Sequence, residues 1–311
     1  MKITGWLPGR TASFRTLAAG VLLSAAGCSA PPNPSFPLET KDAEAALSEM
    51  ARDPKPFERP VVVIGGHMDP GIASSSIAER LCAVCENPRL VRVNVNGVES
   101  MAEARQRVMD AVEAAWPSGD PVWSVEVDVV ANSMGGLVAA SASDPSAGER
   151  ALRIQRLFTI GTPFLGADAA RLPTSNPVIL SMRAGSDFLR RTTPPGRCLE
   201  CELIPYTRSD DQLVGAANTA PPGVTPWWVP AEFFQSGHIT AYKDPRIVAD
   251  VARRLRGEAP FTREPRTPLP SDAESTARSE SSARSSRSHS SDSRSVLATS
   301  GSSAASSDAM H

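Results

Sequence analysis

The stretch that decides the fold is DVVANSMGGLV, residues 128–138. It begins with β-branched apolar residues, which predict a strand buried on both faces, and it continues into a short helix rich in small residues. Ser133 stands at the turn between the two. Ala131 and Gly135, two positions to either side, are small, as a tight turn between neighbouring strands requires. The pattern is typical of a nucleophile elbow, in which a serine sits at a helix N-terminus that favours a developing anion.

Strands and helices alternate on both sides of this stretch. Short apolar runs predict strands, and longer stretches with helical periodicity predict helices between them. The predicted strands are 61–64, 90–95, 122–130, 154–160 and 202–206, and the predicted helices are 75–84, 101–116, 135–142, 177–190 and 245–256. This alternation predicts an α/β fold, with a mostly parallel sheet flanked by helices on both faces. Functional residues should follow Ile64, Val130, Ile160 and Tyr206, at the carboxyl ends of the strands.

The stretch around Ser133 resembles the α/β-hydrolase family, in particular its lipases and esterases, where G-H-S-M-G-G is a frequent form. Ala131 stands for the first glycine and Asn132 for the histidine. The resemblance implies an α/β-hydrolase fold and a serine hydrolase that cleaves carboxylic esters through an acyl-enzyme. Met134 follows the serine, and its N–H is placed to donate to the developing oxyanion. The interval between Ser133 and Asp211 leaves little room for a large cap domain.

A serine nucleophile needs a base, which is usually a histidine. The chain has four histidines, and His289 and His311 lie in a serine-rich C-terminal segment. His67 follows the first strand of the core. His238 precedes the last predicted helix, where the family resemblance expects the catalytic histidine. His238 is therefore the predicted base.

The acid is expected after the fifth strand, where two aspartates are adjacent. Members of the family often carry a D-x-x-V form at this place, and Asp211 with Val214 matches it. Asp210 is the alternative. The resemblance thus implies a catalytic triad of Ser133, Asp211 and His238, in the chain order of the α/β-hydrolases.

The segment after the first strand, residues 65–71, corresponds to the oxyanion loop of the family, with Gly65 in place of its histidine. By that resemblance the His67 N–H is the second oxyanion donor, and the Met68 N–H is the fallback. The alternative is a glycine turn without function. Residues 160–166 carry a G-T-P-x-x-G pattern, which shapes the wall of the acyl pocket in lipase-like members.

The N-terminus is typical of an export signal. Basic residues precede an apolar stretch at 17–27 that is too short to span a bilayer comfortably. Cys28 follows small residues, as in a bacterial lipobox, although Ala25 stands where that motif usually has Leu, Val or Ile. We therefore predict an exported protein of the cell envelope, held to the membrane by a lipid on Cys28. A plain secretory signal is the alternative.

Composition divides the chain into four regions. Residues 1–28 are the predicted lipoprotein-type signal, and 29–59 are a proline-rich tether followed by a short helix at 40–50. Residues 60–257 are the predicted α/β-hydrolase domain. Residues 258–311 are predicted to be disordered, because a serine-rich segment almost without large apolar residues cannot offset its chain entropy.

Four further cysteines form two C-x-x-C pairs, which are Cys82 with Cys85 and Cys198 with Cys201. In an exported protein we expect them to be oxidised to disulfides. A structural zinc site and free thiols are the alternatives.

The overall charge limits the partners. The 311-residue chain has a formal net charge of −2, so no positive field favours nucleic acid. The expected partner is a small-molecule or lipid ester, and no cofactor or metal is implied. Residues 221–230, with Phe233 and Phe234, form either an apolar rim near His238 or packing for the last strand. A catalytically inactive binding or scaffold protein is the alternative function, favoured by Asn132 and by the altered oxyanion loop.

Overall fold

A single six-stranded sheet forms the centre of the protein. The computed structural model describes residues 32–145, 150–193, 201–232 and 235–271. All paired strands are parallel, in the order β2-β1-β3-β4-β5-β6. The strands are β1 (Val61–Ile64), β2 (Leu90–Val93), β3 (Trp123–Asn132), β4 (Ala151–Ile160), β5 (Glu202–Arg208) and β6 (Trp227–Val229).

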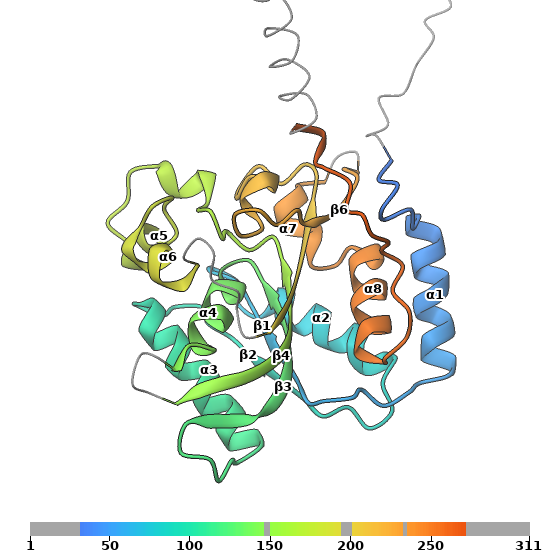
Figure 1. Ribbon diagram of the computed structural model, residues 1–311, viewed down its shortest axis with the longest axis horizontal. Coiled ribbons are helices and arrows are strands. Elements are labelled where there is room, and N and C mark those ends of the chain that lie inside the picture. The colour runs from blue at the N-terminus through green and yellow to red at the C-terminus, as the bar shows by residue number, and fades with distance from the viewer. Residues whose placement is uncertain (1–31, 146–149, 194–200, 233–234, 272–311) are drawn as a thin grey trace, which may run out of the picture.

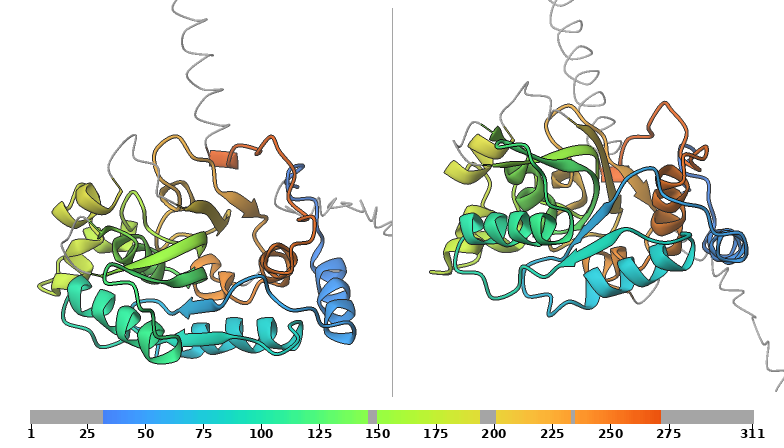
Figure 2. Two further views of the ribbon diagram at one scale, coloured as in Figure 1. Left: turned by 60° about the horizontal axis from the view of Figure 1, so that its bottom comes forward. Right: turned by 90° about the horizontal axis from the view of Figure 1, so that it is seen from below.

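Helices cover both faces of the sheet (Figures 1 and 2). One face carries α2 and α8, with α1 packed on the outside of α8, and the other carries α3, α4 and α6. The helices are α1 (Thr40–Arg52), α2 (Ile72–Ala83), α3 (Met101–Ala115), α4 (Met134–Ala142), α5 (Pro177–Ser181), α6 (Asp187–Thr192), α7 (Gly237–Ala241) and α8 (Pro245–Leu255), with 3-10 turns η2 (Asp168–Arg171) and η3 (Ala216–Asn218). The predicted α/β fold class is confirmed.

The two faces of the sheet have separate apolar cores, and β1 shows how one strand serves both. Val62 and Ile64 pack into the core under α3 and α4, whereas Val61 and Val63 pack into the core under α2 and α8. Successive side chains of a strand point to opposite faces. A strand buried on both faces therefore has a continuous apolar sequence, which explains the run that predicted it.

The carboxyl ends of the central strands are aligned by the strand register. Ile64 of β1 is paired with Ala131 of β3, Asn132 with Ile160 of β4, and Ile160 with Tyr206 of β5. The chain runs from β1 outward to β2 and then returns to β3 on the other side of β1. A crevice for ligands is expected where the strand order reverses in this way. The described connections at this edge consist of short helices and loops, without a large cap.

Three elements differ from the prediction. The segment with His238, which was not predicted as a helix, forms the short helix α7. β6 was not predicted as a strand, and its residues Trp227 and Trp228 are buried at the edge of the sheet. They do not form an apolar rim at the site. The helix predicted at 177–190 is two helices, α5 and α6, because Gly185 between them takes a positive φ of 72° and Ser186 caps the second one.

The predicted tether is wrong for the residues just before α1. Phe36 is 2% exposed and packs against the ring of Tyr206. The Asn33 side chain donates to the carbonyl of Trp228 at 2.6 Å, which covers part of the free edge of β6. The short helix predicted at 40–50 is confirmed as α1. Residues 1–31, with the predicted signal and Cys28, lie outside the described residues.

The predicted disordered tail is likewise wrong for residues 258–271. The N–H of Thr262 donates to the carboxylate of Asp250 at 3.0 Å, and the Trp228 indole donates to the carbonyl of Thr267 at 2.9 Å. Leu269 is 1% exposed. These residues belong to the folded domain. Residues 272–311 lie outside the described part of the chain. No described helix is both long and apolar enough to cross a membrane.

Candidate active site

Ser133 occupies a strained turn between β3 and α4. Its backbone has φ 54° and ψ −127°, which is rarely adopted by a residue with a side chain. Two contacts hold it there. The Ser133 N–H donates to the carbonyl of Ile160 at 2.8 Å, and the Ser133 carbonyl accepts from Oγ1 of Thr162 at 2.8 Å. The strand-to-helix turn expected from the sequence is therefore fixed by the end of β4.

The two glycines after Ser133 are required by close packing. A Cβ at Gly135 would lie 2.5 Å from the carbonyl oxygen of Gly65, and a Cβ at Gly136 would overlap the side chain of Thr162. Both neighbours belong to adjacent strand ends, so the first turn of α4 fits between them only without side chains.

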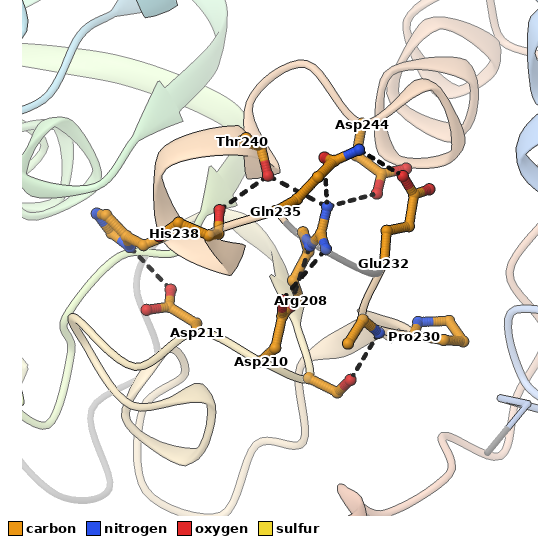
Figure 3. A network of polar contacts seen from close by, with 12 residues as sticks. Arg208, Asp210, Asp211, Pro230, Glu232, Gln235, His238, Thr240 and Asp244 are labelled. Carbon is orange, nitrogen blue, oxygen red and sulfur yellow. Dashed lines mark hydrogen bonds and ion pairs between the residues drawn. The ribbon is translucent and has the colours of Figure 1, made fainter. Parts of the chain in front are cut away.

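His238 and Asp211 complete a chain of contacts to Ser133. Nε2 of His238 lies 3.0 Å from Oγ of Ser133, and Nδ1 lies 2.8 Å from Oδ2 of Asp211. The Asp211 side chain is fully buried, and its other oxygen accepts the N–H of Val214 at 3.0 Å. A carboxylate only accepts, so Nδ1 carries the proton toward Asp211 and Nε2 is left to accept the serine hydroxyl. Figure 3 shows His238 and Asp211 facing each other.

Asp210, the alternative acid, faces away from His238. Its carboxylate accepts two hydrogen bonds from the guanidinium of Arg208, at 3.1 and 3.2 Å. The structure thus brings Asp211 to His238 and Asp210 to Arg208. The sequence analysis missed Arg208. A charged residue at the end of a strand is usually exposed, and the adjacent aspartates were the one signal of a buried partner.

The residues expected to form the oxyanion hole lie beside Ser133. Met134 is the first residue of α4, so its N–H has no acceptor within the helix. Gly66 packs against the serine, because a Cβ there would lie 3.0 Å from the Cβ of Ser133. His67 and Met68 follow Gly66 and both line the cavity, and Met68 is 75% exposed.

Burial lowers the pKa of His67, so its imidazole is neutral at neutral pH. Its Nδ1 and the Oδ1 of Asn132 are buried without a hydrogen-bond partner among the described residues. Asn132 stands where the related motif has histidine, and its amide nitrogen lies close to Gly66. Neither of these two buried atoms is hydrogen-bonded to His238 or Asp211.

A cavity of about 470 Å³ opens at Ser133. Besides Ser133 and Gly66, its polar or partly polar lining consists of His67, Asp69, Asn132, His238 and Tyr242. The remaining lining is mostly apolar. Part of it comes from the segment after β4, of which the sequence predicted only residues 160–166. The apolar lining comprises Met68, Pro70, Ile72, Ala73, Pro163, Ala167, Ala169, Ala170, Ile179, Met182, Leu213, Val214 and Ile239. A cavity of this size and polarity fits an apolar ligand with one polar group.

None of the three described cysteines lines this cavity. Cys82, Cys85 and Cys201 are free thiols, so the disulfides expected within this set are absent. In the part of the chain that the structure describes, no group of three or more His, Cys, Asp or Glu side chains is arranged to hold a metal ion. Cys198 lies outside the described residues. Burial, with a smaller effect of the Glu202 charge, raises the pKa of Cys201 to about 12.

Comparisons with known proteins give structural neighbours but no family assignment. No protein-family model matches the chain, and no curated protein matches it. The sheet order, the turn at Ser133 and the positions of Asp211 and His238 are those of the α/β-hydrolase fold.

Several solved structures are similar in outline. The mature lipase BlEst2 of Bacillus licheniformis has a TM-score of 0.45 and 14% identity, over 68% of this chain and 94% of that one. Aspergillus fumigatus lipase B has a TM-score of 0.41 and 14% identity, over 76% and 71%. The thioesterase RedJ of Streptomyces coelicolor has a TM-score of 0.40 and 17% identity, over 64% and 92%. These values are too low to transfer a substrate.

Proposed function

We propose that this protein is a serine hydrolase that cleaves carboxylic esters through an acyl-enzyme. The observation that supports this most strongly is the continuous contact from Asp211 through His238 to Ser133, at 2.8 and 3.0 Å. The chain of contacts ends on a hydroxyl that lines a largely apolar cavity. A nucleophile, a base within hydrogen-bonding distance and a group that orients the base are the parts that acyl transfer needs.

In the proposed reaction, Nε2 of His238 accepts the proton of Ser133 as Oγ attacks the ester carbonyl. Asp211 keeps the imidazole oriented and stabilises its charged form. The N–H groups of Met134 and His67 donate to the oxyanion, and each such donor typically lowers the barrier by about 2.7–4 kcal/mol. His238 then protonates the departing alcohol, which leaves the acyl group on Ser133. A water molecule, activated by His238, releases the acid and restores the serine.

The cavity supports an ester with an apolar acyl group, as in lipases and carboxylesterases. Its side chains beyond the nucleophile are mainly aliphatic, and burial of each CH₂ group of a ligand contributes about 0.8 kcal/mol. With p-nitrophenyl esters of increasing chain length, kcat/KM should therefore rise until the chain fills the cavity and then fall. A flat or steadily falling series would contradict an apolar acyl site.

A fluorophosphonate probe tests the proposed function against the inactive scaffold. The probe should label the wild-type protein and should not label Ser133→Ala, because the reagent reacts with an activated serine hydroxyl. A folded wild-type protein that remains unlabelled would instead support the scaffold.

We also propose that the protein is anchored in the cell envelope through a lipid on Cys28. The supporting observation is the sequence alone, in which a short apolar stretch and small residues precede the cysteine. Metabolic labelling with a radioactive fatty acid should mark the wild type and not Cys28→Ser. Equal labelling of both, or of neither, would contradict the anchor.

A further inference from the structure

Arg208 is a buried cation at the junction of the acid-bearing turn and the base-bearing helix. It is the last residue of β5, and its side chain is 1% exposed. Its backbone carbonyl accepts the N–H of Asp211 at 3.1 Å. The residue that carries the buried charge therefore also begins the turn that presents Asp211 to His238.

The guanidinium of Arg208 holds this turn through Asp210. Nε donates to Oδ1 at 3.1 Å, and Nη2 donates to Oδ2 at 3.2 Å. An arginine that meets a carboxylate at two points fixes its orientation as well as its distance. Asp210 is thereby fixed, and the backbone carries this constraint directly to Asp211.

The same guanidinium holds the segment that carries His238 on both sides of this residue, before α7 and within it (Figure 3). Nη1 of Arg208 donates to Oε1 of Gln235 and to Oγ1 of Thr240, each at 3.2 Å. Gln235 precedes His238 by three positions and Thr240 follows it by two. The Thr240 hydroxyl in turn donates to the carbonyl of Ser236 at 2.9 Å, so the start of α7 is included in the same set of bonds.

A backbone contact adds to this bridge. Gly237 lies directly before His238, and a Cβ at Gly237 would be 2.6 Å from the carbonyl carbon and oxygen of Asp210. Any side chain larger than hydrogen would push α7 away from the turn. The helix with the base and the turn with the acid therefore meet twice, through Arg208 and through this glycine.

The burial of a charge at this position favours a role in geometry. Removing a guanidinium from water is costly, and the cost is offset here by Asp210 and by Asp244, whose Oδ2 lies 3.9 Å from Nη1. An apolar residue could fill a strand end at lower cost, because replacing buried ion pairs by apolar residues is often neutral or stabilising. An apolar residue, however, could not form hydrogen bonds to the turn at Asp210 and to the segment around His238 at the same time.

We propose that Arg208 is a positioning residue, which sets the placement of His238 against Asp211 and Ser133. Its kinetic consequence rests on the proposed hydrolase function. Asp210, in this arrangement, anchors Arg208 and is not a second acid. Arg208 itself does not line the cavity at Ser133, so it acts on the reaction only by setting the base and the acid against each other.

The kinetic test compares two arginines in similar surroundings. Arg208→Lys keeps the charge, but a lysine cannot bond Asp210, Gln235 and Thr240 at once. We therefore expect kcat to fall about 10²-fold. KM should stay within about twofold, because the cavity is unchanged. Thr240→Val removes a single partner and should cause a smaller loss. Arg156→Lys is the control, because Arg156 also binds a buried aspartate at two points, Asp128, but in the middle of β3 and β4, level with the amino ends of β1 and β5. It should leave kcat unchanged.

Two outcomes of the kinetic test would overturn the proposal. One is a wild-type kcat in Arg208→Lys. The other is an equal loss in Arg156→Lys, which would indicate a general cost of altering buried arginines.

A double substitution separates positioning from general damage. Positioning acts through the contact between His238 and Asp211, so Arg208→Lys should change the fluorophosphonate labelling rate little when Asp211→Asn has already weakened that contact. If the two losses multiply, the role of Arg208 is not exerted through this contact and the proposal fails.

A spectroscopic measurement tests the geometry without catalysis. The Nδ1 proton of His238, hydrogen-bonded to Asp211, should give a downfield proton resonance that Arg156→Lys keeps and Arg208→Lys moves or loses. An unchanged resonance in Arg208→Lys would overturn the proposal. If the resonance responds as expected but the wild type does not react with the fluorophosphonate, the hydrolase function fails and the positioning role stands.

Discussion

Two neighbouring aspartates at the end of β5 have different surroundings. Asp211 is fully buried, with one oxygen on His238 and the other on the N–H of Val214. Asp210 is 20% exposed at its side chain and pairs with Arg208. The spacing to Val214 favoured Asp211 in the sequence, but spacing alone left Asp210 open. The choice depends on which side of the turn each side chain takes, and a turn of this kind has no periodic sequence pattern.

The two carboxylates should therefore respond differently to removal of charge. Asp211→Asn places an amide against Nδ1 and favours the wrong tautomer of His238, so we expect a loss of kcat of about 10⁴-fold, as in other triads. Asp210→Asn weakens only the anchor of Arg208 and should cost much less. Steady-state kinetics on an ester substrate measure both. A larger loss of kcat in Asp210→Asn than in Asp211→Asn would show that Asp210, and not Asp211, is the catalytic acid.

The thiol of Cys201 should be unreactive in the folded protein. Burial raises its pKa to about 12, so almost none of it is thiolate at pH 8, and the thiolate is the nucleophile. Iodoacetamide at pH 8 should leave Cys201 unmodified under native conditions and modify it fully in urea, as seen by peptide mass spectrometry. Rapid native modification would show that the side chain is accessible.

At the scale of elements, the junction between β3 and α4 depends on close backbone contact. The sequence predicts this junction well, since a buried strand, a serine and two glycines together leave few alternatives. In contrast, β6 has three residues between proline-rich flanks, too short for a periodic pattern. The division of the segment at 177–190 depends on one glycine with positive φ, which sequence periodicity does not reveal.

Gly135→Ala tests the packing of this junction. The added Cβ would lie 2.5 Å from the carbonyl oxygen of Gly65, where backbone on both sides must move. We expect the free energy of unfolding to fall by about 1–3 kcal/mol and esterase activity to be lost. Gly119→Ala is the control, because no atom lies within 4 Å of an added Cβ there. Urea unfolding of the two variants should differ clearly, and equal stabilities would contradict the close contact.

At the scale of the whole molecule, the two ends of the described chain pair with each other over β6. The N–H of Arg263 donates to the carbonyl of Ser35 at 2.8 Å, and Thr267 exchanges hydrogen bonds with Ser35. Composition did not predict this, because Phe36 and Leu269 are single buried residues within polar, proline-rich sequence. The sheet and its two cores were predictable, since their strands and helices carry long periodic patterns.

A shortened chain tests whether residues 258–271 belong to the fold. Ending the chain after Gly257 removes the buried side chain of Leu269, whose burial contributes about 1.5–3 kcal/mol to stability. It also leaves the buried carboxylate of Asp250 without the hydrogen bonds from the N–H groups of Phe261 and Thr262. When the loss of these two hydrogen bonds is added, the free energy of unfolding should fall by about 3 kcal/mol or more. A chain ending after Ser271 is the control. Equal unfolding midpoints in urea for the two chains would show that the segment adds nothing.

The central claim is that Ser133, activated by His238, becomes acylated. The most direct measurement is rapid acid quenching of the protein with a p-nitrophenyl ester, followed by intact and peptide mass spectrometry. We predict a mass increase equal to one acyl group, located on the peptide that contains Ser133 and absent from Ser133→Ala. Turnover of the ester with no adduct on that peptide, or with the adduct on another residue, would contradict the proposed mechanism.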